Sequence, residues 1–200
     1  MRRRGFKARG PAAILLALIS VVTALVTRPW ERPRRSSPPP GDLPATGVVE
    51  KAVDGDTLHV EANGWRYTVR LIGVDTPEAH PSEKLERDAK RSAQDRETIM
   101  TLGRRAAELT RQLCDGKSCR LEYDQANAAS HHRDKYERVL AYVWVRGDQG
   151  QEVFVNEELI RRGYARALTA YPYDEKVKER FRRLDREARE RKRGLWREWQ

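Results

Sequence analysis

The chain has 200 residues, of which 35% are charged and 38% are hydrophobic, a polar composition that still suits one globular domain with a tail. The net charge of +10 is unevenly distributed. Residues 1–44 hold nine basic residues (Lys and Arg) and two acidic ones (Asp and Glu), whereas residues 45–200 hold 31 basic and 28 acidic residues. The high pI therefore belongs mainly to the N-terminal part, so it does not by itself make the rest of the chain a nucleic-acid-binding domain.

Residues 1–27 have the layout of an export signal. Five basic residues lie within the first ten, and the fifteen residues from Ala12 to Val26 carry no charge. As a helix this stretch spans about 22 Å, short of a hydrocarbon core of about 30 Å. Cleavage near Ala24 and retention as an uncleaved anchor, with the basic end in the cytoplasm, both remain open. Either way we expect an exported domain, anchored to the membrane and facing outward, or secreted or periplasmic.

Residues 28–45 form a linker rich in Pro and Arg, which has no means of building a packed core. The folded domain is expected to cover residues 46–200. A first strand is predicted over Gly47–Val53. Leu58–Val69 then alternates polar and apolar residues around Asn63-Gly64, which predicts a tight β-hairpin.

A hairpin brings its two ends together, so Asp56 before it should meet Arg70 and the segment after it. That segment adds the carboxylates of Asp75 and Glu78. Taken alone, Asp54-Gly55-Asp56-Thr57 can be an ordinary turn, and the Asp75–Glu78 segment can be the start of a helix or turn. Together they predict an oxygen-rich site for a hard cation, Ca²⁺ or Mg²⁺ rather than zinc, beside a phosphate-binding arginine.

The polar segment Ala79–Ser92 is expected to be a loop running into a helix over Ala93–Leu113, whose apolar residues recur every three or four positions. Cys114 and Cys119 are the only two cysteines and flank a short turn before a strand at Arg120–Tyr123. In an exported protein this spacing predicts a disulfide. Two thiolates without a second nearby pair make an incomplete zinc site.

The second half of the chain contains a strand, two helices and an aromatic loop. Arg138 precedes a buried strand at Val139–Val145, where it is either a second phosphate ligand or the partner of Asp134 or Glu137.

A helix over Val155–Arg162 is expected to be capped by Asn156 and stopped by Gly163. Tyr171-Pro172-Tyr173 either stacks on bases or packs inward. A last helix spans Val177, Phe181, Leu184 and Ala188, after which Gly194 stops the chain and Leu195-Trp196 returns to the core.

The chain from about Thr46 to Trp196 resembles the staphylococcal nuclease (thermonuclease) family. The resemblance is carried by six separated motifs in the expected order: Asp54-Gly55-Asp56-Thr57, Arg70–Glu78, Asp134-Lys135-Tyr136 with Arg138, Val155–Leu159 with Gly163, Tyr171 with Tyr173, and Gly194-Leu195-Trp196. It implies an α+β, mainly β fold: a five-stranded OB-fold-like barrel with three helices.

The resemblance also implies roles for single residues. Asp56 and Asp75, with the carbonyl of Thr76, match the calcium ligands. Glu78 matches the residue that positions or deprotonates the attacking water, and Arg70 and Arg138 match the arginines that grip the scissile phosphate. Tyr136, Tyr171 and Tyr173 match the tyrosines on the substrate side.

The implied activity is an exported, Ca²⁺-dependent nuclease that cleaves DNA or RNA, preferably single-stranded, and leaves 3′-phosphate ends. The alternative is a non-catalytic nucleic-acid-binding or interaction module on the same fold. One departure favours the alternative, because the family commonly has Gly where this chain has Glu137. If that position needs a positive φ, Glu brings strain there.

Overall fold

The structure, a computed structural model, describes residues 43–147 and 149–198, so the predicted export segment and most of the linker lie outside the described residues. Within the described part, no helix is both long and apolar enough to cross a membrane.

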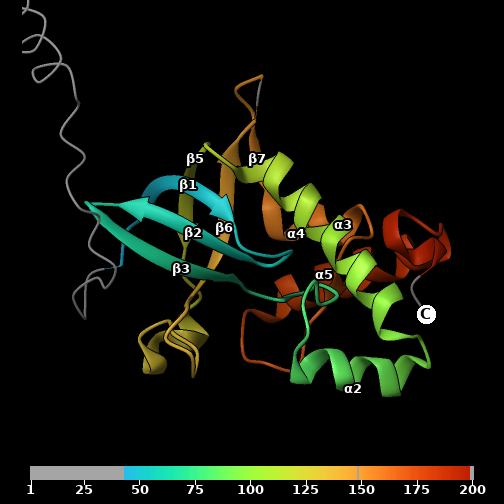
Figure 1. Cartoon of the computed structure of the whole chain (residues 1–200). Helices are drawn as coiled ribbons and strands as arrows, with labels where there is room; N and C mark the ends of the chain where they lie inside the picture. Colours follow the sequence, from blue (N-terminus) through green and yellow to red (C-terminus); the bar gives the residue numbers. More distant parts are fainter. Residues whose placement is uncertain (1–42, 148, 199–200) are drawn as a thin grey trace, which may run out of the picture. The chain divides into compact units, whose positions relative to one another are not determined.

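Five strands close into a barrel: β1 (Thr46–Ala52), β2 (Thr57–Ala62), β3 (Trp65–Leu71), β5 (Ser118–Glu122) and β6 (Val139–Arg146). Neighbouring strands pair in the order β3-β2-β1-β5-β6, and a parallel pairing of β3 with β6 closes the ring. A short strand, β7 (Glu152–Phe154), extends the sheet beyond β6 (Figure 1). The predicted five-stranded barrel is therefore confirmed.

The hairpin at the front of the barrel forms as predicted. Asn63 and Gly64 have φ values of 53° and 78°, as a two-residue turn with both central residues in the left-handed region requires. The register then pairs Ala62 with Trp65 at the turn and Thr57 with Arg70 at the open end. The apolar positions of both strands, such as Leu58 and Val69, face the buried interior.

Helices and short irregular elements cover the barrel. These elements are α2 (Glu83–Ser92), α3 (Arg96–Cys114), α4 (Val155–Arg161), α5 (Glu175–Glu190), two 3-10 turns, η1 (Gln125–Ser130) and η2 (Gly194–Arg197), and a small separate pair of strands, β4 (Val74–Asp75) with β8 (Arg166–Ala167). α3 packs against β1, and α4 lies between β6 and α5. Leu195 and Trp196 are buried against Leu102 of α3 and Ala188 of α5, which confirms their predicted return to the core.

The helix count differs from the expectation of three, because the described part holds four α-helices. The residues from 83 to 92 form a helix of their own, capped by Ser82, whose Oγ accepts the Leu85 amide at 3.0 Å. Asp95 starts the next helix by accepting the Thr98 amide at 2.9 Å. The periodicity of apolar residues predicted a loop followed by one helix, but two capping side chains start two separate helices here, α2 and α3.

The prediction that Asn156 caps its helix is wrong. Its side chain instead links three elements inside the barrel. Its side-chain oxygen accepts the Val143 amide of β6 at 2.9 Å, and its nitrogen donates to the Ile72 carbonyl at 2.9 Å. The residue is fully buried, and Phe154 takes the N-cap position. A buried amide with both ends bonded fixes where the chain leaves β3, just before the Asp75–Glu78 segment.

We predict that Asn156→Ala lowers the free energy of unfolding by about 2–4 kcal/mol, because it leaves a buried amide and a buried carbonyl without their partners. Denaturant unfolding measures the change. Gln112→Ala, at an exposed position on α3, is the control and should stay within about 0.5 kcal/mol. Equal stability of the Asn156 variant and the native protein would contradict this role.

The predicted disulfide is wrong for this structure, in which Cys114 and Cys119 are free, buried thiols. The turn between them is already closed by backbone hydrogen bonds: Gly116 donates to the Val49 carbonyl at 2.8 Å, and Val49 donates to the Lys117 carbonyl at 2.9 Å. The sequence spacing therefore reflects a turn docked on β1 by its main chain. Burial raises the pKa of Cys114 to about 12 and that of Cys119 to about 11.

Both thiols should accordingly react slowly with a thiol-specific chromogenic reagent at pH 8 in the native protein, because the thiolate is the reactive form. In denaturant, two thiols per chain should react at once. The contrary result is the absence of any reactive thiol in denaturant, measured on protein purified without reductant. It would show that Cys114 and Cys119 form a disulfide.

Candidate active site

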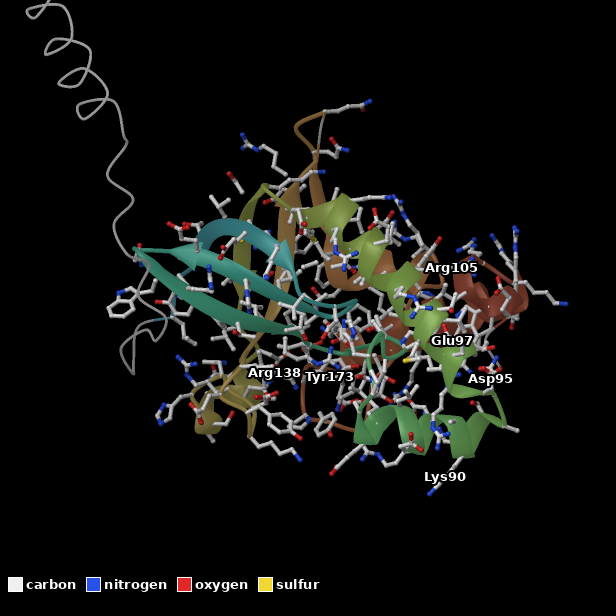
Figure 2. All side chains as sticks on the ribbon, in the orientation of Figure 1. Lys90, Asp95, Glu97, Arg105, Arg138 and Tyr173 are labelled. Atoms are coloured by element: carbon white, nitrogen blue, oxygen red, sulfur yellow. The ribbon has the colours of Figure 1, made fainter. Side chains whose placement is uncertain are left out.

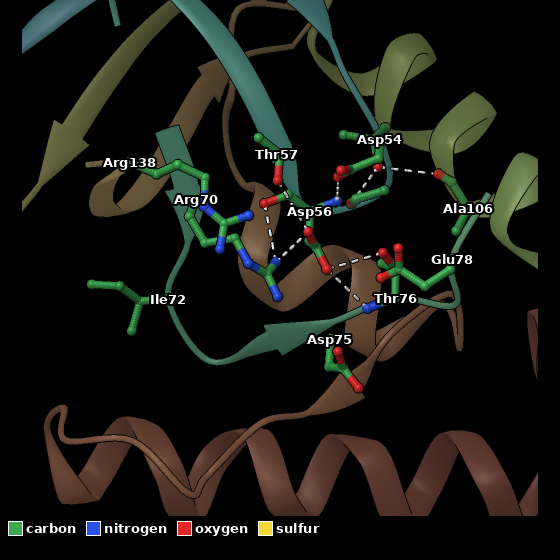
Figure 3. A network of polar contacts seen from close by, with 12 residues as sticks. Asp54, Asp56, Thr57, Arg70, Ile72, Asp75, Thr76, Glu78, Ala106 and Arg138 are labelled. Carbon is green, nitrogen blue, oxygen red and sulfur yellow. Dashed lines mark hydrogen bonds and ion pairs between the residues drawn. The ribbon is translucent and has the colours of Figure 1, made fainter. Parts of the chain in front are cut away.

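The two ends of the β2–β3 hairpin meet as the sequence predicts. Asp56 directly precedes β2, and Arg70 lies near the end of β3, opposite Thr57 in the register. The chain then turns through Gly73 into β4, which delivers Asp75 and Thr76 to the same corner. Figure 3 shows Asp56 at the centre of this corner, with Arg70 on one side and Thr76 and Glu78 on the other.

Asp56 is the most connected residue of the corner and only 7% of its surface is exposed. One carboxylate oxygen forms an ion pair with Arg70 and accepts the Thr57 hydroxyl at 3.2 Å. The other oxygen accepts both the amide and the hydroxyl of Thr76, at 3.1 and 3.0 Å. This one side chain therefore joins the start of β2, the end of β3 and the segment after β4.

The charges of the corner act on one another strongly. Burial alone would raise the pKa of Asp56, but Arg70, Lys84 and the Thr76 amide outweigh it and lower the pKa. Burial would lower the pKa of Arg70, but the carboxylates of Asp56 and Asp75 raise it. Asp54 behaves differently: burial and the neighbouring Asp56 raise its pKa to about 7. Asp56 and Arg70 are thus held charged in a nearly dry place.

Lys84, from the first turn of α2, is the residue that the sequence analysis missed. Its ammonium lies 2.7 Å from the Thr76 carbonyl, 3.0 Å from a Glu78 carboxylate oxygen and 3.1 Å from one of Asp75. Burial would lower the pKa of Lys84, but these carboxylates raise it. The sequence signal for this contact is the capping Ser82, which would have started a helix and placed Lys84 close after Glu78.

The oxygen donors fit a hard divalent cation in their chemistry, since the carboxylates of Asp75 and Glu78 and the Thr76 carbonyl converge on one point. In this structure that point is held by the Lys84 ammonium, and both oxygens of Asp56 are already engaged by Arg70, Thr57 and Thr76. Over the described residues, no three or more His, Cys, Asp or Glu side chains converge closely enough to hold a metal ion. Of the predicted ligands, Asp75 and the Thr76 carbonyl thus contact an internal cation, and Asp56 is engaged by Arg70, Thr57 and Thr76.

Arg138 reaches the same corner from the neighbouring strand. β3 and β6 pair in parallel with Arg70 beside Leu140, so Arg138 lies just before this pairing, and in Figure 3 its guanidinium lies beside that of Arg70. Its Nε and Nη2 both contact one Asp134 oxygen, at 2.8 and 2.7 Å. The ion pair with Asp134 that the sequence left open is therefore present. This ion pair occupies the edge of the guanidinium that carries Nε and Nη2.

The three candidate tyrosines divide into two groups. Tyr136 and Tyr171 are each 66% exposed, and the Arg138 guanidinium lies 5.3 Å from the ring centre of Tyr136. Tyr173 is 3% exposed and packs against Phe181, with ring centres 6.3 Å apart. Tyr173 therefore takes the inward packing that the sequence left open, and its contact with substrate stays a prediction. Its position two residues after Tyr171, across Pro172, turns it into the core.

Comparison with known proteins now adds to this geometry. A family model described as Staphylococcal nuclease homologue matches residues 68–198, more than half of the chain. The chain belongs to this family.

Named relatives agree with the assignment. The chain is 32% identical to the Thermonuclease of Staphylococcus hyicus over 151 residues, which cover 76% of this chain and 75% of that protein. It is 32% identical to the Endonuclease YncB of Bacillus subtilis (strain 168) over 149 residues, covering 74% of this chain and 60% of that protein. An uncharacterized protein, MJ1439 of Methanocaldococcus jannaschii, is 35% identical over 154 residues, covering 75% and 70%.

The one departure from the family pattern noted in the sequence has a backbone consequence. Glu137 has a φ of 62°, in the left-handed region that glycine adopts without penalty. The position is fixed by Asp134, whose carboxylate accepts the amides of Tyr136 and Arg138 at 2.9 and 3.0 Å. The condition that the sequence left open, a positive φ, is thus met, and the strained residue lies directly before Arg138.

Glu137→Gly should therefore raise the free energy of unfolding by about 1 kcal/mol, because it relieves the left-handed strain. Glu137→Ala is the matched control: it removes the charge but keeps the Cβ, so it should leave stability nearly unchanged. Denaturant unfolding of both variants separates the two effects. A gain that is equal in both would assign the effect to the charge instead.

Proposed function

We propose that this protein is a nuclease that hydrolyses phosphodiester bonds of DNA or RNA, is exported, depends on Ca²⁺ and leaves 3′-phosphate ends. The observation that carries the proposal is the buried Asp56–Arg70 pair, beside which Asp75, Thr76 and Glu78 gather on one side and Arg138 on the other. Membership of the nuclease homologue family and the printed names of its relatives support the reaction class.

The chemistry follows from the charge of the substrate. A phosphodiester is anionic, and attack by water builds further negative charge on its equatorial oxygens. Arg70 and Arg138 are placed to neutralise that charge, each guanidinium offering a fork of N–H groups. Glu78, with a side chain 30% exposed at the rim of the corner, can orient the attacking water. Ca²⁺ held by Asp56, Asp75 and the Thr76 carbonyl would add positive charge at the phosphate.

Substrate binding is proposed to use exposed aromatic rings near Arg138 and after β8. Tyr136 and Tyr171 are exposed rings suited to stack on unpaired bases, which favours single-stranded or denatured nucleic acid. The segment over residues 1–27 would direct export, with the linker at 28–45 placing the domain over 46–200 outside the cytoplasm, either membrane-anchored or, after cleavage, secreted or periplasmic.

The test is cleavage of heat-denatured DNA by the purified protein with Ca²⁺ or with EDTA. We expect cleavage with Ca²⁺ alone, and a loss of about a hundredfold or more in rate for Arg70→Ala and for Glu78→Gln. Arg111→Ala, on the exposed face of α3, is the control and should retain full activity.

Folding of each variant must be checked by circular dichroism, because Arg70→Ala leaves a buried carboxylate without its partner. Glu78→Gln avoids this problem at the rim of the site. Binding of DNA without cleavage by the folded native protein, at millimolar Ca²⁺, would instead support a non-catalytic binding module.

A further inference from the structure

The position of Lys84 has consequences beyond the proposed reaction. Its ammonium has three N–H groups, and the three nearest oxygens come from the Thr76 carbonyl, Glu78 and Asp75, all within 3.1 Å. Two of these residues are proposed cation ligands, and the third is the proposed water-orienting carboxylate. A side chain of the protein thus already provides positive charge where the proposed function needs a metal.

The first turn of α2 holds Lys84 firmly in that place. Ser82 caps the helix and also donates its hydroxyl to the second Glu78 oxygen at 3.1 Å, so this turn contacts both oxygens of Glu78. Leu85, next to Lys84, is 1% exposed and anchors the turn in the core. The ammonium is therefore delivered by an ordered element rather than by a freely moving side chain.

An ammonium and a divalent cation exclude each other at this point. Calcium binds oxygen at about 2.3–2.6 Å, closer than the ammonium lies to the same oxygens, so both ions would occupy one volume. Their like charges also repel strongly at such a short separation. Binding of the metal therefore requires Lys84 to leave.

A second acceptor is ready for the displaced ammonium. Asp88, one turn further along α2, has a carboxylate oxygen 3.6 Å from the Lys84 nitrogen. A change of side-chain rotamer toward Asp88 would keep Lys84 paired while it clears the Thr76 carbonyl and Asp75. The helix thus carries both the competing cation and the group that receives it.

We propose that Lys84 is a built-in competitor for the divalent cation and sets the metal concentration that this nuclease requires. This inference rests on the proposed function, since it concerns the same carboxylates. In the absence of metal, the ammonium stabilises the acidic corner and holds Glu78. The metal displaces the ammonium to Asp88 and releases Glu78 to contact water.

The first test is titration calorimetry of the full chain with CaCl₂. Lys84→Met keeps an aliphatic stem of similar length but removes the charge, so we expect it to bind Ca²⁺ about tenfold or more tightly than the native protein. Lys90→Met makes the same change at the exposed end of α2, where Lys90 points away from the barrel (Figure 2), and should stay within about twofold.

Thermal unfolding gives a second readout that does not involve activity. Without metal, Lys84→Met should melt below the native protein, because Asp75, Glu78 and Asp88 lose the positive charge of Lys84. Added Ca²⁺ should raise its melting temperature more than that of the native protein at the same concentration. Lys90→Met should follow the native protein in both conditions.

Amine labelling tests the displacement itself, with Lys90 as the reference within the same helix. Ca²⁺ should increase the labelling of Lys84 by an acylating reagent, read by mass spectrometry, and leave that of Lys90 unchanged. Unchanged labelling of Lys84 while Ca²⁺ binds would overturn the proposal.

The outcomes also separate this inference from the proposed function. If the native protein binds Ca²⁺ and Lys84→Met binds it no more tightly, the competition is overturned while the nuclease proposal stands. If neither protein binds Ca²⁺, both fail. Cleavage in EDTA that Lys84→Met abolishes would overturn the competition in another way, by showing that the ammonium replaces the metal.

Discussion

The buried carboxylate of Asp56 connects the start of β2, the end of β3 and the segment after β4. Its oxygens hold Arg70 from the end of β3, Thr57 at the start of β2, and the amide and hydroxyl of Thr76 after β4. A carboxylate buried to this degree is tolerated only with a cation and several donors around it. The barrel supplies them because the hairpin register brings Arg70 opposite Thr57. Removing Arg70 would leave the charge of Asp56 uncompensated at the place where the proposed reaction occurs, whereas removing the Thr57 or Thr76 hydroxyl would only take away a neutral donor.

The same constraint explains why the corner needs more than one cation. Asp54, Asp56, Asp75 and Glu78 lie close together, while the strands contribute a single guanidinium to them directly, that of Arg70. Lys84 supplies further positive charge from outside the barrel, through a helix that is an addition to the expected three. If the proposed function holds, these carboxylates would repel one another without the metal, and an internal ammonium is one way to stabilise them. The same contact that protects the empty site would then oppose its filling.

Local patterns predicted the barrel well and the contacts of its surface segments less well. Asn63-Gly64 and the alternation around it predicted the hairpin, and therefore the meeting of Asp56 with Arg70, because turn chemistry and register are local properties. The inward-facing Tyr173 and the link made by Asn156 depend on packing between distant segments, which no local pattern contains. The contact of Lys84 is local, and it was missed because the helix start at Ser82 was taken as loop. The cysteine pair misled for a related reason: its spacing fits a disulfide, but the main chain of β1 already closes the turn. At Glu137 the resemblance to a family glycine raised the question of a positive φ, which only the backbone geometry answers.

The proposed function requires nucleic acid and a cation to meet at this corner. A crystal structure of the protein with a single-stranded oligonucleotide and Ca²⁺ tests it most directly. We expect a phosphate between Arg70 and Arg138, a cation among the oxygens of Asp56, Asp75 and Thr76, and Lys84 turned toward Asp88. An oligonucleotide bound to another face, with Lys84 still between Asp75 and Glu78 and no cation beside them, would contradict the account.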